Sequence, residues 1–137
     1  MKAVKFEDVD KKITFQDILD FENKMKIILP INYKGLISKY NGGLTEDSDF
    51  FDVLLSIKYG KQKVEDIINI HQIIENNIPN NYLPVALDWS DNPITINLDE
   101  GNDYGKIVKF YFDTDEEPEI IANSLEELLG VDSIDDL

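Results

Sequence analysis

The chain contains one histidine, His71, and no other side chain suited to act as the base of a hydroxyl nucleophile near neutral pH. It contains no cysteine, which excludes thiolate nucleophiles, disulfides and thiolate zinc sites. His71 follows Ile67 by four residues, on the apolar side of a segment with helical periodicity, where few hydroxyl groups can be aligned with its ring. We therefore predict a partly buried structural histidine and no Ser-His catalytic pair.

Carboxylates are abundant, and their abundance weakens any argument for a catalytic pair. With 28 acidic residues in the chain, some pair will lie at the separation used by glycosidases by chance alone. The acidic runs 99–103 and 113–117 offer oxygen ligands but lack the spacing of a calcium loop, and the Gly-containing segment 101–105 matches neither common phosphate-binding pattern. We predict no catalytic residue, no cofactor and no metal site, and keep a small carboxylate-based hydrolase as the rival from another functional class.

Two aromatic residues lie among acidic residues in predicted loops of the second half of the chain. Trp89 stands between Asp88 and Asp91, and Tyr104 follows a cluster of three acidic residues. Aromatic anchors among complementary charges are typical of protein interfaces, provided that the two loops share one rim of the sheet. The predicted partner-binding residues are Trp89, Asp91, Asp99, Glu100, Asp103 and Tyr104. The alternative interpretation is that Trp89 belongs to the core and the acids form a solvated face.

The charge of the chain is strongly negative and unevenly distributed. The 28 acidic residues face 13 basic ones, all of them lysine, for a net charge of −15. Residues 1–63 hold 11 lysines and 10 acids, a net of +1, whereas residues 64–137 hold 2 lysines and 18 acids, a net of −16. Such a field repels nucleic acid and anionic lipid and attracts cationic partners. We predict a basic protein partner, no nucleic acid and no membrane; charge that serves solubility alone is the other interpretation.

Three helices are predicted in the first half of the chain. The sequence Thr-Phe-Gln-Asp at 14–17 resembles a capping box and begins a helix that runs to about residue 28. Apolar residues at i, i+3, i+4 and i+7 predict a second helix over 33–40, with Pro30 suited to its first turn and Asn41-Gly42 to left-handed closure. Apolar periodicity predicts a third helix from residue 61 to about residue 76.

The second half has the pattern of a sheet closed by a helix. Strands are predicted at 50–57, 83–87, 94–98 and 107–112, with loops or turns at 44–49, 76–81, 90–93 and 101–105. Ser124 is placed to cap a last helix over 125–129. We expect residues 1–137 to form a single α+β domain, with an antiparallel-rich sheet of about four to six strands packed against helices. Without a signal-peptide pattern or a long apolar run, the expected location is the cytoplasm.

Four short blocks follow one another in order, at 29–43, 84–98, 105–113 and 121–129. The first contains Leu-Pro, a tyrosine three residues later and Asn-Gly-Gly; the last contains Ile-Ala, then Ser-Leu-Glu-Glu-Leu-Leu. Together the blocks resemble the signature of the SUKH superfamily, widespread as bacterial immunity proteins, with yeast cell-wall assembly regulators among its relatives. The residues that carry the resemblance are Leu29, Pro30, Tyr33, Tyr40, Asn41, Gly42, Gly43, Pro84, Gly105 and Ser124.

The resemblance implies a non-enzymatic protein that binds and neutralises a toxin domain made by its own cell, commonly a nuclease or another enzyme that modifies nucleic acid. It supplies no catalytic residue to carry over. Two loops depart from the family pattern: the turn 90–93 lacks consecutive glycines, and 113–115 holds Asp-Thr-Asp where relatives often have a histidine. We predict a monomer that occludes a cognate, cytoplasm-acting toxin domain, with an intracellular scaffold or regulatory module as the rival among binding proteins.

Overall fold

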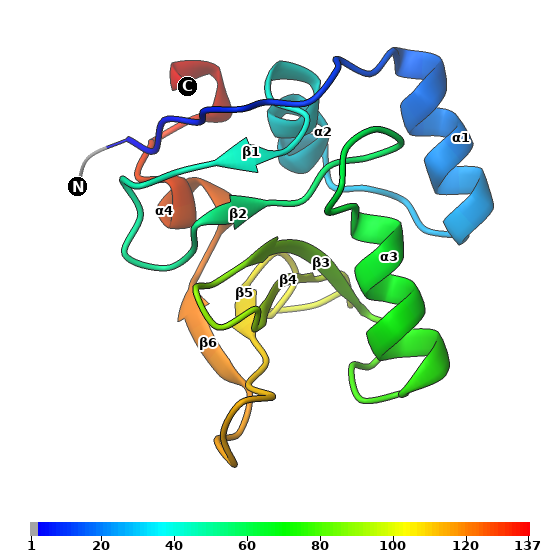
Figure 1. Cartoon of the computed structure of the whole chain (residues 1–137), viewed down its shortest axis with the longest axis vertical. Helices are drawn as coiled ribbons and strands as arrows, with labels where there is room; N and C mark the ends of the chain where they lie inside the picture. The colour runs from blue at the N-terminus through cyan, green and yellow to red at the C-terminus, as the bar shows by residue number, and fades with distance from the viewer. Residues whose placement is uncertain (1–2) are drawn as a thin grey trace.

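Six strands form one antiparallel sheet in the computed structural model, which describes residues 3–137 (Figure 1). The strands lie side by side in chain order: β1 (Gly43–Leu44), β2 (Val53–Leu54), β3 (Tyr82–Leu87), β4 (Pro93–Asn97), β5 (Ile107–Lys109) and β6 (Glu119–Ala122). The α-helices are α1 (Phe15–Met25), α2 (Ile31–Lys39), α3 (Val64–Ile68) and α4 (Leu125–Leu129). A π-helix, η1 (Asn69–Ile74), continues α3, and a 3-10 turn, η2 (Ile134–Asp136), follows α4. The predicted α+β class is confirmed.

The predicted starts of α1 and α4 are confirmed, because they depend on contacts only three residues apart. Thr14 Oγ1 accepts from the Asp17 N–H at 3.1 Å, and the Asp17 carboxylate accepts from the Thr14 N–H at 2.9 Å, which completes the capping box of α1. Ser124 Oγ accepts from the Glu127 N–H at 3.0 Å at the start of α4. Pro30 stands at the N-cap of α2, one position before its first turn.

Four predicted boundaries are wrong, and one of them is the end of the predicted strand 107–112, of which only β5 (Ile107–Lys109) belongs to the sheet. Helix α1 ends at Met25, not near residue 28, because Lys26 adopts a left-handed conformation with φ 57°. The predicted helix from residue 61 starts only at Val64, because Ser56 pairs with the chain on either side of Lys63: its N–H donates to the Gln62 carbonyl and its carbonyl accepts from the Val64 N–H. Of the predicted strand 50–57, only Val53–Leu54 pairs with neighbouring strands.

Two strands were not predicted. The two residues of β1 lie at the start of a segment predicted as a loop, and β6 includes Ile121-Ala122, which resembled part of the closing helix block. Neither strand has an alternating pattern long enough to be recognised, since β1 has two residues and β6 has four. Both lie at the edges of the sheet, where half of the backbone groups need no partner in the ladder.

The buried side chain of Asn41 joins three distant segments. Its Nδ2 donates to the carbonyl oxygens of Lys11 at 2.8 Å and Ile57 at 3.0 Å, and its Oδ1 accepts from the Ile57 N–H at 2.8 Å. Of the pair Asn41-Gly42, predicted to give left-handed closure of α2, only Gly42 has a positive φ, of 79°; the helix ends at Lys39 and its C-cap, Tyr40, is extended. Asn41 therefore links the N-terminal segment, the end of α2 and the segment after β2.

The two glycines that follow Asn41 are required by backbone geometry and by space. Gly42 and Gly43 have φ of 79° and 134°, which side-chain-bearing residues rarely adopt. A Cβ on Gly42 would lie 2.7 Å from Ser56 Cβ, and one on Gly43 would lie 2.9 Å from the Glu7 carbonyl oxygen. The Gly-Gly pair thus lets the chain leave the Asn41 site and enter β1 directly.

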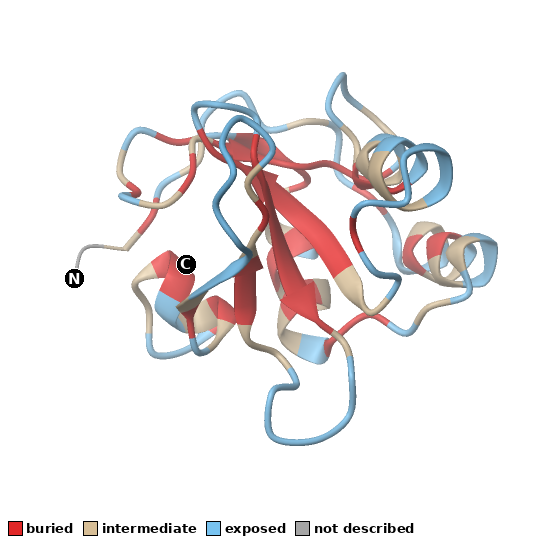
Figure 2. Ribbon diagram, turned by 90° about the horizontal axis from the view of Figure 1, so that it is seen from below, coloured by how far each residue is buried: buried red, intermediate tan, exposed pale blue. Residues whose placement is uncertain are grey.

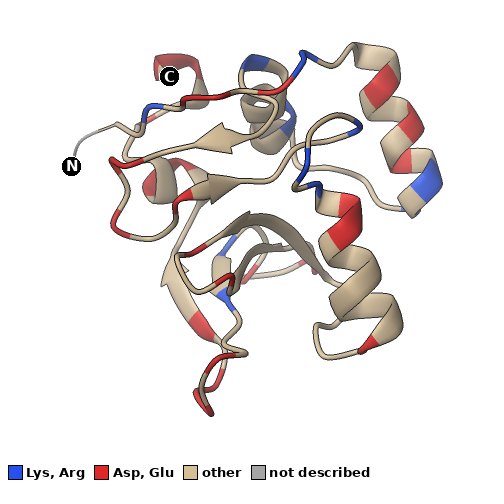
Figure 3. Cartoon of the chain, in the orientation of Figure 1, with Lys and Arg blue, Asp and Glu red and all other residues tan. Residues whose placement is uncertain are grey.

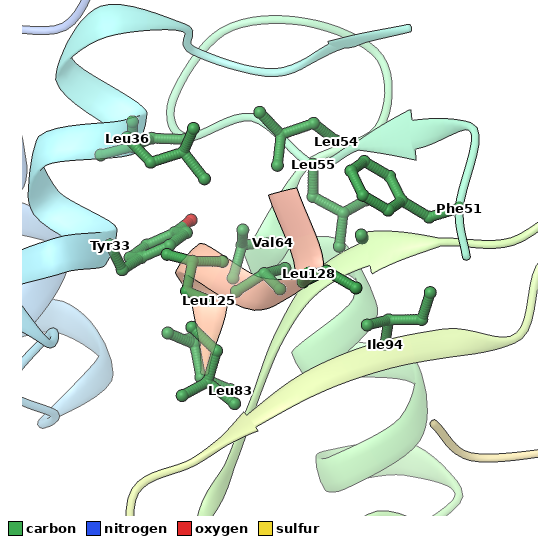
Figure 4. Close-up of a cluster of buried hydrophobic side chains, with 14 of the residues drawn as sticks. Tyr33, Leu36, Phe51, Leu54, Leu55, Val64, Leu83, Ile94, Leu125 and Leu128 are labelled. Carbon is green, nitrogen blue, oxygen red and sulfur yellow. The ribbon is translucent and has the colours of Figure 1, made fainter. Parts of the chain in front are cut away.

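The main core lies between the helices and one face of the sheet, and the middle strands are buried almost throughout (Figure 2). The predicted apolar stripe of α2 faces this core, with Tyr33, Leu36 and Ile37 all fully buried. Figure 4 shows the Tyr33 hydroxyl pointing inward among apolar side chains. It has no hydrogen-bond partner among the described residues, and burial raises the pKa of this hydroxyl far above its ordinary value. A smaller cluster around Ile78, Val108 and Phe110 covers the opposite face of the sheet.

Replacement of Asn41 by alanine should lower the free energy of unfolding by about 3 kcal/mol, because it leaves buried backbone groups of two segments without partners. Urea unfolding followed by circular dichroism measures the change. Asn23→Ala is the matched control, since Asn23 is exposed on α1 and should give a change within about 0.5 kcal/mol. Equal effects of the two substitutions would contradict the role assigned to Asn41.

Replacement of Tyr33 by phenylalanine should stabilise the protein, unlike replacement of Asn41 by alanine. The substitution removes a buried hydroxyl that has no partner and keeps the ring, so the free energy of unfolding should rise by about 1 kcal/mol. Urea unfolding again provides the measurement. A loss of stability of similar size would mean that the hydroxyl is hydrogen-bonded in solution.

Candidate functional site

The predicted partner-binding residues occupy two loops, which the structure places at opposite ends of β4. Trp89 and Asp91 lie in the β3–β4 turn, whereas Asp99, Glu100, Asp103 and Tyr104 lie in the β4–β5 loop. Four residue steps along β4 separate the two ends by ~13 Å. The expectation that the two loops share one rim is therefore wrong, because successive turns of an antiparallel meander lie at alternate ends of the sheet.

The β3–β4 turn is organised by the carboxylate of Asp88. Asp88 Oδ1 accepts from the N–H groups of Ser90 and Asn92, both at 2.9 Å. Its Oδ2 accepts from Asn92 Nδ2 at 3.2 Å and from Lys109 Nζ at 2.5 Å. Asp91 takes a left-handed conformation with φ 61° in this turn. Trp89 and Asp91 are thereby held outward on a rigid loop.

Asn92 is buried and connects the turn to the β5–β6 loop. Its Nδ2 donates to Asp113 Oδ1 at 2.9 Å, and its Oδ1 accepts from the Phe112 N–H at 2.9 Å. Asp113 thus receives a specific hydrogen bond from the buried Asn92 side chain. The β3–β4 turn and the start of the β5–β6 loop therefore form one connected surface.

We call this surface the acidic sheet end. It consists of Asp52, Asp88, Trp89, Asp91, Tyr111, Asp113 and Glu119. Trp89 is 62% exposed, which excludes the alternative that it belongs to the core. An exposed tryptophan surrounded by carboxylates offers a cation an aromatic face as well as negative charge.

The pKa values of Asp88 and Asp52, both at the acidic sheet end, are shifted in opposite directions. Burial raises the pKa of Asp88, but the hydrogen bonds from Lys109 and from the backbone of Asn92 and Ser90 outweigh it and hold the pKa below its ordinary value. Burial raises the pKa of Asp52, and repulsion from Asp88 and Asp91 adds to the rise. Asp52 Oδ1 is also buried without a hydrogen-bond partner among the described residues. The acidic sheet end therefore has an unbalanced negative potential.

Lys109 and Tyr111 connect Asp88 to β6. Lys109 Nζ lies 4.7 Å from the centre of the Tyr111 ring, and the Tyr111 hydroxyl donates to Glu119 Oε1 at 2.8 Å. This hydrogen bond, followed by burial and repulsion from nearby acids, raises the pKa of Tyr111 to about 12. Lys109 is consequently occupied by internal contacts and does not neutralise the outer carboxylates.

The β4–β5 loop at the other end of β4 is organised differently. Asp103 pairs with Lys106 at 2.9 Å, and the Asp99 N–H donates to Asn97 Oδ1 at 2.9 Å. Gly105 has a φ of 83°, and its N–H donates to the Asn97 carbonyl at 2.8 Å. Tyr104 is 47% exposed. This loop therefore forms a second acidic surface, separate from the acidic sheet end, and the two loops do not form one site.

The single histidine, considered above as a catalytic base, lies in a structural environment. The prediction of a partly buried histidine is confirmed: the His71 ring stacks on Phe112 with centres 4.7 Å apart, and Nδ1 lies 3.1 Å from Asn77 Oδ1. In the described part of the chain, no group of three or more His, Asp or Glu side chains could hold a metal ion. The same residues include no helix long and apolar enough to cross a membrane.

A groove of about 770 Å³ lies between the end of α1, α3 with η1, and β3. Apolar residues such as Met25, Ile73 and Leu83 line it together with groups of both charges. Its charged residues Lys24 and Glu65 pair with each other at 2.7 Å. Sequence periodicity alone could not identify this groove, because its walls come from separate segments of the chain, the end of α1, α3 with η1, and β3.

Two comparisons with known proteins bear on the family. Residues 12–130 match the model of the SMI1/KNR4 family (SUKH-1), a range that contains every motif residue from Leu29 to Ser124. The predicted resemblance to the SUKH superfamily is confirmed. No curated protein matches the chain.

Replacement of Lys109 by glutamine should raise the pKa of Asp88, because burial still disfavours the carboxylate while the largest opposing interaction is lost. In the wild type, the stability contributed by the lowered pKa is complete above the ordinary value of 3.8 and is lost as the pH falls through the folded value. In the variant this contribution is smaller or absent, because the folded pKa of Asp88 moves up toward or past its ordinary value. Carboxyl carbon NMR across a pH titration measures the shift.

Lys106→Gln is the matched control for this titration. Lys106 pairs with Asp103 at the other end of β4, so its loss should leave the Asp88 titration unchanged. Equal shifts of Asp88 in the two variants would mean that overall charge, and not the Lys109 contact, sets its pKa.

Proposed function

The chain belongs to the SMI1/KNR4 family (SUKH-1), and from this premise we propose that it binds and neutralises a cognate toxin domain. The family is one of non-enzymatic immunity and regulatory domains. The proposed mechanism is occlusion: the bound protein covers the surface through which the toxin reaches its substrate, without chemical change to either partner. We propose that a monomer of this chain forms the complex in the cytoplasm of the cell that makes the toxin.

The observation that carries this proposal is the exposed Trp89 within a turn held by the Asp88 and Asn92 hydrogen bonds. Binding hot spots are enriched in tryptophan, and a rigid loop loses little conformational entropy when it becomes buried in a complex. No packing requirement of the chain itself explains an indole in this place, since the main core and the smaller cluster both exclude Trp89.

Charge supports a toxin that acts on nucleic acid. An enzyme that binds phosphate backbone does so with lysine and arginine, and its substrate surface is therefore basic. Figure 3 shows acidic residues along the β3–β4 turn and the β5–β6 loop, whereas most lysines lie in the N-terminal half. Opposite charges on the two partners accelerate association and favour one orientation of the complex.

The rival among binding functions is a scaffold or regulatory module. The observation in its favour is the 770 Å³ groove, which is lined by α1, α3, η1 and β3 and contains none of the residues of the acidic sheet end. Two separate surfaces suit a protein with several partners. Such a module would bind each partner weakly, whereas an immunity protein binds one partner tightly.

A tagged pull-down from an extract of the source cells separates these functions. The bait is washed at low and then high salt, and retained proteins are identified by mass spectrometry. One protein with a basic toxin domain, retained in stoichiometric amount and inhibited when mixed with the purified chain, is the expected result. Several partners that are all lost in salt would contradict toxin neutralisation and favour the scaffold.

With that toxin domain in hand, we expect the acidic sheet end to control association. Asp91→Asn in this surface, combined with Asp115→Asn and Glu116→Gln in the adjoining β5–β6 loop, should slow association about tenfold at low salt and flatten its salt dependence, because exposed charges act mainly on encounter. Trp89→Ala should instead accelerate dissociation about tenfold or more. Stopped-flow mixing or a biosensor measures both rates.

The matched control removes three exposed acids from the β4–β5 loop. Asp99→Asn, Glu100→Gln and Asp103→Asn change the net charge equally but act at the other end of β4. This variant should slow association by less than a factor of about three. A control effect as large as that of the first triple variant would reject the acidic sheet end as the contact surface.

A further inference from the structure

The two edges of the sheet differ in whether their backbone groups have partners. At the β1 edge, Glu7 covers Leu44: each N–H donates to the other residue's carbonyl at 2.8 Å. At the other edge, β6 pairs with β5 on one side only, and it is the outermost strand in Figure 1. Among the described residues, no backbone hydrogen bond beyond the β5 ladder involves residues 119–122. The chain therefore covers one edge and leaves the other open.

The ladder register identifies the outward backbone groups of β6. The Val108 carbonyl faces β4, because the Thr95 hydroxyl donates to it at 2.8 Å and Thr95 is its partner in that strand. In an antiparallel ladder, the N–H and C=O of one residue point to the same neighbouring strand, and successive residues alternate. Val108 and Ile120 are opposite each other, so they do not exchange hydrogen bonds across β5 and β6. The N–H and C=O of Ile120 consequently point outward.

The two faces of β6 at this edge differ in chemistry. Ile120 is 54% exposed and lies on the side of Val108, which belongs to the smaller apolar cluster. Glu119 lies on the opposite side, where the Tyr111 hydroxyl orients its carboxylate. A strand added here would place one set of side chains beside an isoleucine and the alternate set beside a glutamate. The matching sequence alternates apolar with basic residues.

Negative charge near β6 disfavours pairing of this edge with a second copy of the chain. Two copies of this chain paired through β6 would bring together the acids that flank the strand, among them Glu116, Glu117 and Glu119. Like charges at an edge disfavour pairing of this kind. The same acids attract a strand that carries lysine or arginine. Lys109, the one lysine nearby on β5, already pairs with Asp88.

We propose that β6 binds an extended basic segment of the partner protein as an additional antiparallel or parallel strand. The outward N–H and C=O of Ile120 provide the backbone hydrogen bonds, the Ile120 side chain provides an apolar contact, and Glu119 pairs with a basic side chain. This inference deepens the proposed function and rests on it for the identity of the partner, a basic toxin domain. Strand addition itself depends only on the edge and can be tested without the toxin.

The probe is a ten-residue peptide of alternating lysine and valine, blocked at both ends. Titration into the isotopically labelled full chain should shift the Ile120 amide resonance saturably and slow its exchange with solvent. Ile120→Pro should weaken binding at least about tenfold, because it removes the outward N–H and places a ring in the path of the added strand. Proline is tolerated on edge strands where the N–H faces solvent, and Ile120→Val, which keeps the N–H, is the matched control and should bind like the wild type.

A second peptide keeps the test decisive even if Ile120→Pro unfolds the chain. The same sequence with an N-methyl group on every residue keeps every charge but has no N–H on either edge to donate to the ladder, and it should bind at least about tenfold more weakly. Equal binding of the two peptides, or no saturable binding of the first at millimolar concentration, would overturn strand addition. These outcomes are independent of toxin inhibition: a chain that binds the peptide at β6 but inhibits no toxin keeps this inference and loses the proposed function.

Discussion

The Asn41 amide group is the constraint on which the first half of the fold depends. One side chain supplies partners to Lys11 and Ile57, which lie 30 and 16 residues away along the chain. Because the amide is fully buried, each of these hydrogen bonds forms where an unpaired group would be costly. Helix α2 brings Asn41 to this position by burying its own apolar face, and Gly42 and Gly43 then direct the chain into β1. The N-terminal segment that Asn41 holds continues to Glu7, which covers the β1 edge.

A second buried asparagine has the corresponding role in the second half. Asn92 connects the β3–β4 turn to Phe112 and Asp113, as Asn41 connects α2 to its neighbours. The two sites differ in what they leave outside. Around Asn41 the chain encloses its own edge, whereas around Asn92 it exposes Trp89 and Asp91. Internal hydrogen bonds thus help to cover the β1 edge near Asn41, whereas near Asn92 they hold a turn that leaves Trp89 and Asp91 exposed.

Features that depend on neighbours three or four residues apart could be predicted from the sequence. The Thr14 capping box, the Ser124 cap and the buried stripe of α2 are of this kind. The strands β3 and β4 were predictable from a continuous apolar run and from alternation of apolar with polar residues, respectively. The role of Asn41 could not be predicted in this way, because a left-handed closure and a buried cross-link require the same residue type. The position of the acidic loops was predictable in principle. Once 83–87, 94–98 and 107–112 are assigned to consecutive antiparallel strands, the turns between them must alternate between the two ends of the sheet.

The negative charges of the acidic sheet end act on one another, as Asp52, Asp88 and Asp91 show. Asp88 is stabilised as an anion by Lys109 and backbone N–H groups, whereas burial first, and then repulsion from Asp88 and Asp91, raise the pKa of Asp52, whose Oδ1 has no hydrogen-bond partner in the described chain. The folded protein therefore retains an electrostatic repulsion that none of its nearby lysines relieves. A cation from the proposed basic partner would weaken this repulsion, which is the physical reason for assigning such a partner to the acidic sheet end. In the β4–β5 loop, by contrast, Asp103 is already paired with Lys106. For this reason the acidic sheet end suits the proposed basic partner better than the β4–β5 loop does.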